Sequence, residues 1–220
     1  MTEIKNLGFD LREIVYTFNL RHNEDCSHLF DWIAAKYELN EVENTILDDL
    51  HEYIQGNGEY MNEEELKTKM VGLIFYAAKI EVPRKVMVFY ERPLAGTIQN
   101  IPLSVICDCI VATPLVSAPQ HPYFFLQEAP SRPSPKGKEN FIKKKKDLEA
   151  QMLVAMLIAQ AKNNDQKPIY GAYLIGTGWH FATLIADEYC VSPRIEVTKK
   201  DDLLKVVYAL RKLKDLILNR

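Results

Sequence analysis

Apolar residues recur at spacings of three and four along the first quarter of the chain, which is the pattern of helices that bury one face. The pattern predicts three helices, at residues 9–22, 27–38 and 41–55. Ser27 and Asn40 precede the second and third of them, and side chains of these types cap the first turn of a helix. Because the polar faces are crowded with Asp and Glu, we expect residues 1–58 to form an acidic helical extension that packs on the rest of the chain.

A fourth helix is predicted from Asn62 to about Lys79. Asn62 is a capping residue, and the three glutamates that follow it suit the positive end of the helix dipole. Pro83 closes this helical stretch. Three runs rich in Val, Ile, Phe and Tyr come next, punctuated by Pro and Gly, and they predict a meander of strands at residues 85–91, 103–112 and 123–128.

Helical spacing returns in the second half of the chain and then alternates with strand character. The pattern predicts a helix, two strands and a final amphipathic helix, at residues 143–162, 169–175, 179–185 and 201–219. Gly176, Thr177 and Gly178 join the two strands, which is typical of a hairpin turn. The order of helix, three strands, helix, hairpin and helix predicts an α+β domain at residues 59–220.

The hairpin carries several aromatic side chains of the types that stack on nucleobases. At strand spacing, such side chains more often pack in the core or across strands, and we predict this for Tyr170, Tyr173, Trp179 and Phe181. His180 alternates with two of them and is expected to face outward.

Charge is distributed unevenly along the 220 residues, although 27 Lys and Arg nearly balance 30 Asp and Glu. Residues 1–65 contain 16 acidic and 4 basic residues, a formal charge of −12, and residues 66–220 carry +9. The segment from Arg132 to Lys146 holds seven basic residues and one acidic residue. This density of positive charge would attract a phosphate backbone without reading its sequence.

The cysteines and the apolar segments indicate a soluble cytoplasmic protein. Cys26, Cys107, Cys109 and Cys190 contain no C-x-x-C pair, so a zinc site is not indicated and reduced thiols are expected. The N-terminus lacks the basic start and apolar core of a signal peptide. The longest apolar runs are far shorter than the ~20 residues that span a bilayer, so we expect no membrane partner.

Asp108 is the first candidate for chemistry, because it interrupts an apolar strand between Cys107 and Cys109. Alternation along the strand would place its side chain on the face opposite both cysteines. A buried carboxylate needs a partner, and Glu128 at the end of the next strand could converge with it on Mg²⁺ or Mn²⁺. The alternative is that Asp108 pairs with a core arginine or lysine while Glu128 ends its strand at the surface.

The order of these segments resembles the PD-(D/E)xK nuclease superfamily. The resemblance is to its uncharacterised bacterial branch similar to the N-terminal nuclease domain of type I restriction enzyme R subunits. The matching stretches are NEEELKTKM at 62–70, FYERPL at 89–94, CDCIVAT at 107–113, YFFLQE at 123–128, AQMLVAMLIAQAKN at 150–163 and IYGAYLIGTGWHF at 169–181. The resemblance spans residues 26–218 and implies a restriction-endonuclease-like core.

The resemblance also implies roles for particular residues. Asp108 and Glu128 would be the metal ligands, Gln151 the polar residue of the following helix that faces the site, and Glu63 the first-helix acid that completes it. Such a site hydrolyses phosphodiesters, because the divalent ion polarises the phosphate and lowers the pKa of the attacking water.

The lysine of the motif is missing, because Pro130 stands two residues after Glu128. One interpretation is that Lys144, two helical turns before Gln151, has taken over its role. The other is that the site is degenerate and the fold serves binding. In either case the basic residues expected to contact nucleic acid are Arg132, Lys136, Lys138, Lys143, Lys145 and Lys146.

The sequence therefore predicts a DNA-binding relative of metal-dependent endonucleases with a degenerate catalytic motif. Whether it is still an enzyme is left open by Pro130. The alternative is a non-catalytic protein-interaction module that retains the nuclease fold, with a homodimer or a partner protein docking on the acidic helices or the lysine-rich segment.

Overall fold

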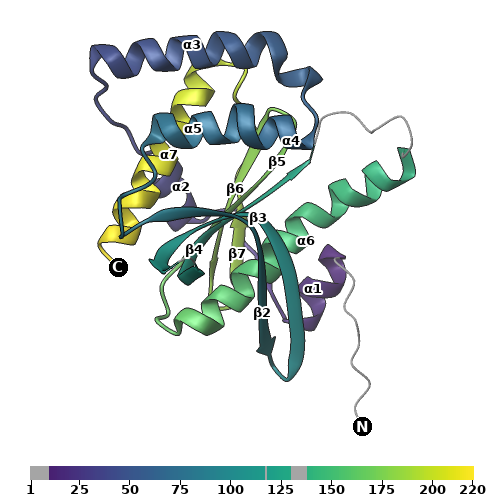
Figure 1. Cartoon of the computed structure of the whole chain (residues 1–220). Helices are drawn as coiled ribbons and strands as arrows, with labels where there is room; N and C mark the ends of the chain where they lie inside the picture. Colours follow the sequence, from purple (N-terminus) through teal and green to yellow (C-terminus); the bar gives the residue numbers. More distant parts are fainter. Residues whose placement is uncertain (1–9, 117, 130–137) are drawn as a thin grey trace.

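The protein is a mixed α+β fold in which helices cover both faces of a large sheet (Figure 1). The computed structural model describes residues 10–116, 118–129 and 138–220, and it describes their side chains except at 121–123, 128–129 and 138–147. The α-helices are α1 (Leu11–Thr17), α2 (Ser27–Ile33), α3 (Glu41–Asn57), α4 (Glu63–Glu65), α5 (Gly72–Ala78), α6 (Lys138–Asn163) and α7 (Lys200–Leu218). The strands are β1 (Arg21–His22), β2 (Met87–Ile98), β3 (Ile101–Leu115), β4 (Ala118–Ala129), β5 (Ile169–Ile175), β6 (Gly178–Ile185), β7 (Glu188–Val191) and β8 (Ile195–Glu196).

The described strands form one sheet in the order β1-β7-β6-β5-β4-β3-β2, and β8 pairs with β6. Strands β2, β3 and β4 form an antiparallel meander, as predicted. The connection through α6 makes β5 parallel to β4, and β5 and β6 form the predicted hairpin. Within this hairpin, Ile175 pairs with Gly178, so Gly176 and Thr177 form the turn, and Gly176 adopts the positive φ of 59° that such a turn requires.

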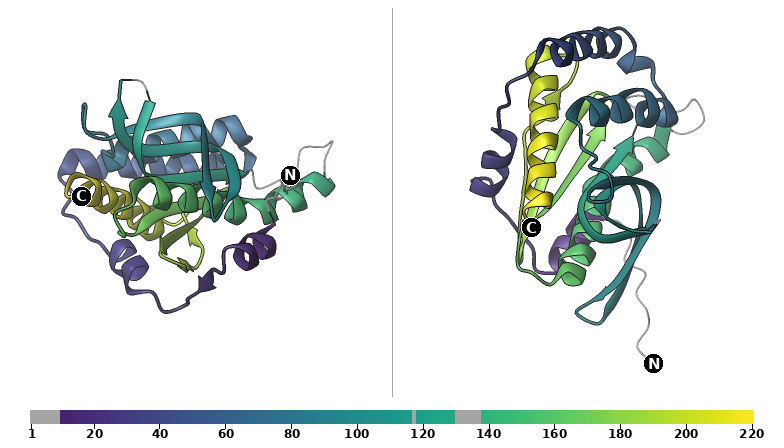
Figure 2. Two further views of the ribbon diagram at one scale, coloured as in Figure 1. Left: turned by 90° about the horizontal axis from the view of Figure 1, so that it is seen from below. Right: turned by 60° about the vertical axis from the view of Figure 1, so that its left-hand side comes forward.

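Two hydrophobic cores lie on opposite faces of the sheet, because successive residues of the central strands alternate between them. Phe124 and Leu126 face the core shared with α2, α3, α5 and α7, whereas Phe125 faces the core beneath α1 and α6. The first core is centred on Trp32, which makes edge-to-face contacts with Phe124, Tyr170 and Phe181. Helices α2 and α3 therefore share one core with the sheet and α7, and Figure 2 shows them alongside α7.

The capping predictions for two helices are confirmed. Asn40 and Glu43 form a capping box at the start of α3, and Asn62 and Glu65 form another at α4. The helical stretch that begins at Glu63 continues through a π-helical segment, Leu66–Val71, into α5. It ends at Lys79, whose left-handed conformation (φ 51°) terminates the helix before Pro83.

Several predicted boundaries are wrong. The first helix ends at Thr17 instead of residue 22, because Asn19 takes a left-handed conformation and Arg21–His22 form a strand. The second helix ends at Ile33. Strand β2 runs on through Pro93 to Ile98, since a strand at the edge of the sheet tolerates a residue without a backbone N–H.

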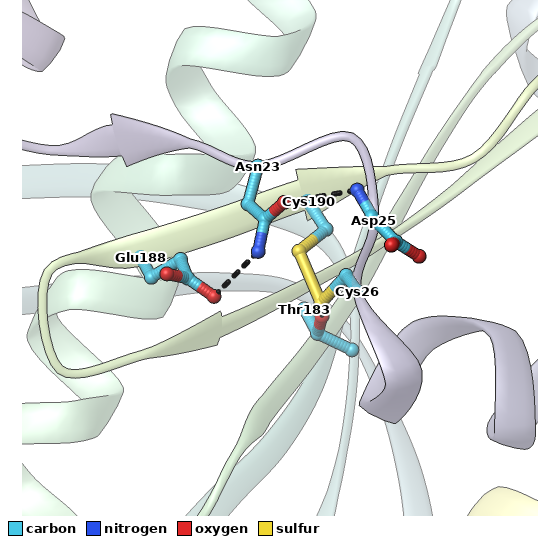
Figure 3. Close-up of a disulfide and its surroundings, with 6 residues drawn as sticks. All are labelled: Asn23, Asp25, Cys26, Thr183, Glu188 and Cys190. Atoms are coloured by element: carbon cyan, nitrogen blue, oxygen red, sulfur yellow. Dashed lines mark hydrogen bonds between the residues drawn. A yellow bond between two sulfur atoms is a disulfide. The ribbon is translucent and has the colours of Figure 1, made fainter.

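The N-terminal segment is fastened to β7 by both hydrogen bonds and a disulfide (Figure 3). The backbone N–H of Asn23 donates to the carbonyl oxygen of Tyr189 at 2.9 Å, and its side chain donates to Glu188 at 2.9 Å. Cys26 and Cys190 then form a disulfide across 164 residues of sequence, and both are buried. The prediction of reduced thiols is therefore wrong for this pair, because the fold brings together cysteines that sequence spacing does not associate.

No helix within residues 10–116, 118–129 and 138–220 has the length and apolarity that a membrane-spanning segment requires.

Candidate functional site

Asp108 lies in β3 at an irregularity that it shares with β2. Residues on both sides are paired, Tyr90 with Cys109 and Arg92 with Cys107, while Glu91 between them has a left-handed φ of 51°. At this irregularity, the alternation of β3 side chains between the two faces of the sheet shifts by one residue. Cys107 belongs to the core beneath α6 and Cys109 to the core beneath α5 and α7, so the prediction that they share a face is wrong.

The two cysteines beside Asp108 are buried and lie outside the disulfide. Burial, with a smaller contribution from the charge of Asp108, raises the pKa of the Cys107 thiol to about 12. The thiol therefore remains protonated at neutral pH and is not a nucleophile. This leaves the half-buried carboxylate as the chemical feature of this stretch.

Lys67 is a functional candidate that sequence reasoning missed. It lies in the π-helical segment after α4, its side chain is only 11% exposed, and it forms an ion pair with Glu91. Glu91 occupies the β2 position between the partners of Cys107 and Cys109, so the residue that Lys67 pairs with lies next to Asp108 on the neighbouring strand. No spacing in the sequence signals this role, because it depends on the contact with Glu91 of β2.

Glu128 lies on β4, the strand that neighbours β3 on the side away from β2. Cys109 pairs with Leu126 in an antiparallel register, so Asp108 and Glu128 both lie just beyond this pair in the same direction. The backbone of Glu128 pairs with Leu174 of β5, and its side chain lies outside the described residues. The structure thus brings the two predicted ligands to adjacent strands, of which β3 lies next to the edge strand β2.

Gln127, next to Glu128, is a second residue that sequence reasoning did not single out. Its side chain is 1% exposed, and its amide Nε2 donates to the carbonyl oxygen of Ile106 at 3.2 Å. This bond ties β4 to the backbone of β3 just beside Asp108. It holds the relative position of the two acidic residues through a buried polar contact.

The other two predicted site residues come from opposite sides of the sheet. Glu63 is half-buried in the first turn of α4, where Asn62 and Glu65 form the capping box. Gln151 is half-buried on α6, which covers the other face. Both could therefore reach one site only at an end of the strands.

The predicted basic residues fall largely on undescribed side chains. Arg132 and Lys136 lie outside the described residues. The backbones of five others belong to α6, namely Lys138, Lys143, Lys144, Lys145 and Lys146, and their side chains are not described. The helix begins five residues earlier than predicted, so Lys144 and Gln151 are two turns apart on one continuous helix, as predicted.

The described side chains do not by themselves make a metal site, since no group of three His, Cys, Asp or Glu among them could hold an ion. A site at Asp108 would need the carboxylate of Glu128 to complete it. Comparison with protein-family models found no match, and no curated protein was similar. Functional assignment therefore rests on the residues and geometry of this chain.

Proposed function

We propose that this protein is a DNA-binding relative of divalent-metal-dependent endonucleases, built on a restriction-endonuclease-like core with an altered catalytic motif. The observation that supports this most is the position of Asp108 and Glu128 on adjacent strands beside the ion pair of Lys67 and Glu91. Carboxylate ligands for a divalent ion and a cation near the phosphate are the groups that phosphodiester hydrolysis requires, and β2, β3 and β4 carry residues of these types or bind one.

The connections of the chain support the same proposal. The helical stretch ending in α5 precedes the meander β2–β3–β4, and α6 then carries the chain to β5, parallel to β4. This is the order on which the resemblance was based. In this order the lysine-rich first turns of α6 follow β4, the strand that carries Glu128, and a phosphate backbone held by these turns would be the substrate presented to the site.

Lys67 is a second candidate, after Lys144, for the role of the motif lysine that Pro130 replaces. A cation that supports catalysis must be held by its surroundings, and Lys67 is more enclosed than a lysine on a solvated helix face. Its ion pair with Glu91 holds it against β2, the strand next to β3. We therefore assign to Lys67 the role of stabilising the developing negative charge on phosphate.

Mg²⁺ or Mn²⁺ fits the chemistry of Asp108 and Glu128, since hard divalent cations prefer carboxylate oxygen. When bound, the ion would polarise the phosphate and lower the pKa of the attacking water. The part played by the chain itself is to hold the carboxylates on adjacent strands, which Gln127 secures, and to supply Lys67.

The proposal predicts that the purified protein binds a labelled DNA duplex at low salt, with affinity that falls steeply as salt rises. Mn²⁺ should raise its melting temperature and permit cleavage.

Asp108→Asn should remove both effects of Mn²⁺. Lys67→Met should reduce cleavage about 10²–10³-fold, the usual effect of removing one group that stabilises transition-state charge, while keeping the Mn²⁺-induced rise. Asp201→Asn, at an exposed position on α7, is the matched control and should behave as wild type.

Two results would decide against catalysis or against the whole proposal. DNA binding without any Mn²⁺ effect would assign the protein to the degenerate class, in which the fold serves only binding. Absence of both DNA binding and a Mn²⁺ effect would contradict the proposal and favour the non-catalytic protein-interaction module.

A further inference from the structure

A pocket of about 470 Å³ lies on the α6 side of the sheet, between the start of α1, α6 and the β5–β6 hairpin. Its volume is within the range of small-ligand sites. The lining residues are Asp10, Leu11, Arg12, Glu149, Tyr173, Ile175 and His180. Figure 1 shows α1 lying beside α6 at this face. The pocket adjoins the candidate site, because Tyr173 pairs in the sheet with Gln127, the residue before Glu128.

An ordered aromatic pair forms one side of the pocket. Tyr173 and His180 are directly opposite each other on β5 and β6, and their rings stack with centroids 4.7 Å apart and planes inclined by 16°. The Nδ1 atom of His180 lies 3.2 Å from the carbonyl oxygen of Ser192, which fixes the ring. His180 is half-buried in this pocket, so the expectation that it faces outward is not met.

Glu149 supplies a carboxylate next to this stack. The hydroxyl of Tyr173 donates to its Oε2 atom at 3.1 Å, which within the described part of the chain is its one hydrogen bond. Burial raises the pKa of Glu149, while the bond from Tyr173 and the nearby His22 lower it. Each oxygen of a carboxylate can accept more than one hydrogen bond, and Glu149 lines the pocket, so it can accept from a ligand while it holds Tyr173.

We infer that this pocket binds a guanine base, with Glu149 accepting hydrogen bonds from its donor edge and the Tyr173–His180 pair supplying an aromatic surface. Guanine presents two neighbouring N–H donors, and a carboxylate accepts both in parallel. Enzymes that act on nucleic acids read an extruded base in this way, by its hydrogen-bonding edge and by stacking. Arg12 at the rim is suited to the attached phosphate.

This inference rests on the proposed function, since a nucleic acid bound to the protein would supply the base, and the pocket borders β5, the strand next to β4. The ligand could be a free nucleotide or an unpaired guanine in a single strand. Binding of guanosine 5′-monophosphate and of a thymidine oligomer carrying one guanine distinguishes these two sources. Binding of either supports the pocket, and a preference for the oligomer identifies it as part of a nucleic-acid surface.

The test is calorimetric titration with guanosine 5′-monophosphate and with inosine 5′-monophosphate, which lacks the exocyclic amine. Wild type should bind inosine 5′-monophosphate about 10-fold more weakly, the value of one charge-assisted hydrogen bond. Glu149→Gln should weaken the binding of guanosine 5′-monophosphate by a similar factor. Glu24→Gln, at an exposed position, is the control and should change nothing. The comparison of the two nucleotides uses wild type alone, so it stands even if the Glu149 variant does not fold.

Three outcomes would overturn the inference: no nucleotide binding, equal affinity for both nucleotides, or tighter binding of spermidine, which would indicate an acidic site for cations. The proposed function is tested separately with Asp108→Asn. This variant should lose both effects of Mn²⁺ and still bind guanosine 5′-monophosphate like wild type. A wild-type protein that binds guanosine 5′-monophosphate but shows neither duplex binding nor a Mn²⁺ effect would contradict the nuclease proposal and leave the pocket supported.

Discussion

Reduction of the Cys26–Cys190 disulfide is expected to lower the melting temperature by about 4–20 °C. The bond closes a loop that includes most of the chain, because its cysteines are 164 positions apart in the sequence. In the chain-entropy description, such a closure restricts the unfolded state by about 5 kcal/mol, and measured values for native disulfides are about 2–5 kcal/mol. The bond also joins the segment before α2 to β7, so its loss releases the helix that carries Trp32.

The experiment compares thermal unfolding of wild type and a Cys26→Ala, Cys190→Ala double variant, each with and without reductant. Wild type should lose stability in reductant, and the double variant should melt at one lower temperature in both conditions. Cys107 and Cys109 remain in both proteins, so they serve as internal controls for effects of reductant on other thiols. A wild-type melting temperature that does not change on reduction would contradict a bonded pair.

Local patterns were sufficient to predict much of the fold. The capping residues Asn40 and Asn62 and the turn at Gly176 depend on a few neighbouring residues, and all three are as predicted. The strands β1 and β8 have two residues each, too few for any periodicity to be read. They form because partners far along the chain present an open edge, which no local pattern records.

Part of the candidate site could also be predicted from local patterns in the sequence. Asp108 was found because a carboxylate in an apolar strand is unusual, and the pairing of its strand with the one that carries Glu128 was expected from a meander. Lys67 was not found, because its relevance depends on Glu91, which is 24 residues away on an edge strand. The Glu149–Tyr173 pair likewise joins two elements through packing of a helix on the sheet. Such contacts follow from tertiary structure and not from spacing.

The replacement Glu43→Gln is expected to destabilise the protein by about 3 kcal/mol, because it leaves a buried arginine without its carboxylate. Glu43 accepts from Lys79 at 2.7 Å and from Arg211 at 3.0 Å, and the side chain of Arg211 is only 8% exposed. Arg211 also donates to the carbonyl oxygen of Ala77, so this cluster joins α3, α5 and α7. Glu52→Gln, at an exposed position of the same helix, should change stability by less than about 0.5 kcal/mol.

The same cluster predicts how stability depends on pH. The pKa of Glu43 is lowered to about 2 from its ordinary value of 4.5. The largest cause is the hydrogen bond from Lys79, followed by the bond from the backbone N–H of Asn40 and the charge of Arg211. A carboxylate with a lowered pKa contributes stability above its unfolded pKa and loses it as pH falls through the folded pKa. Denaturant unfolding between pH 5 and pH 2 should therefore show wild type losing more stability than Glu43→Gln.

A third variant separates the charge from the packing. In Glu43→Gln with Arg211→Met, no buried charge is left unpaired, so stability should recover relative to Glu43→Gln alone. A double variant no more stable than Glu43→Gln would mean that the ion pair is not the source of the loss. Equal pH dependence in wild type and Glu43→Gln would show that other carboxylates control acid unfolding.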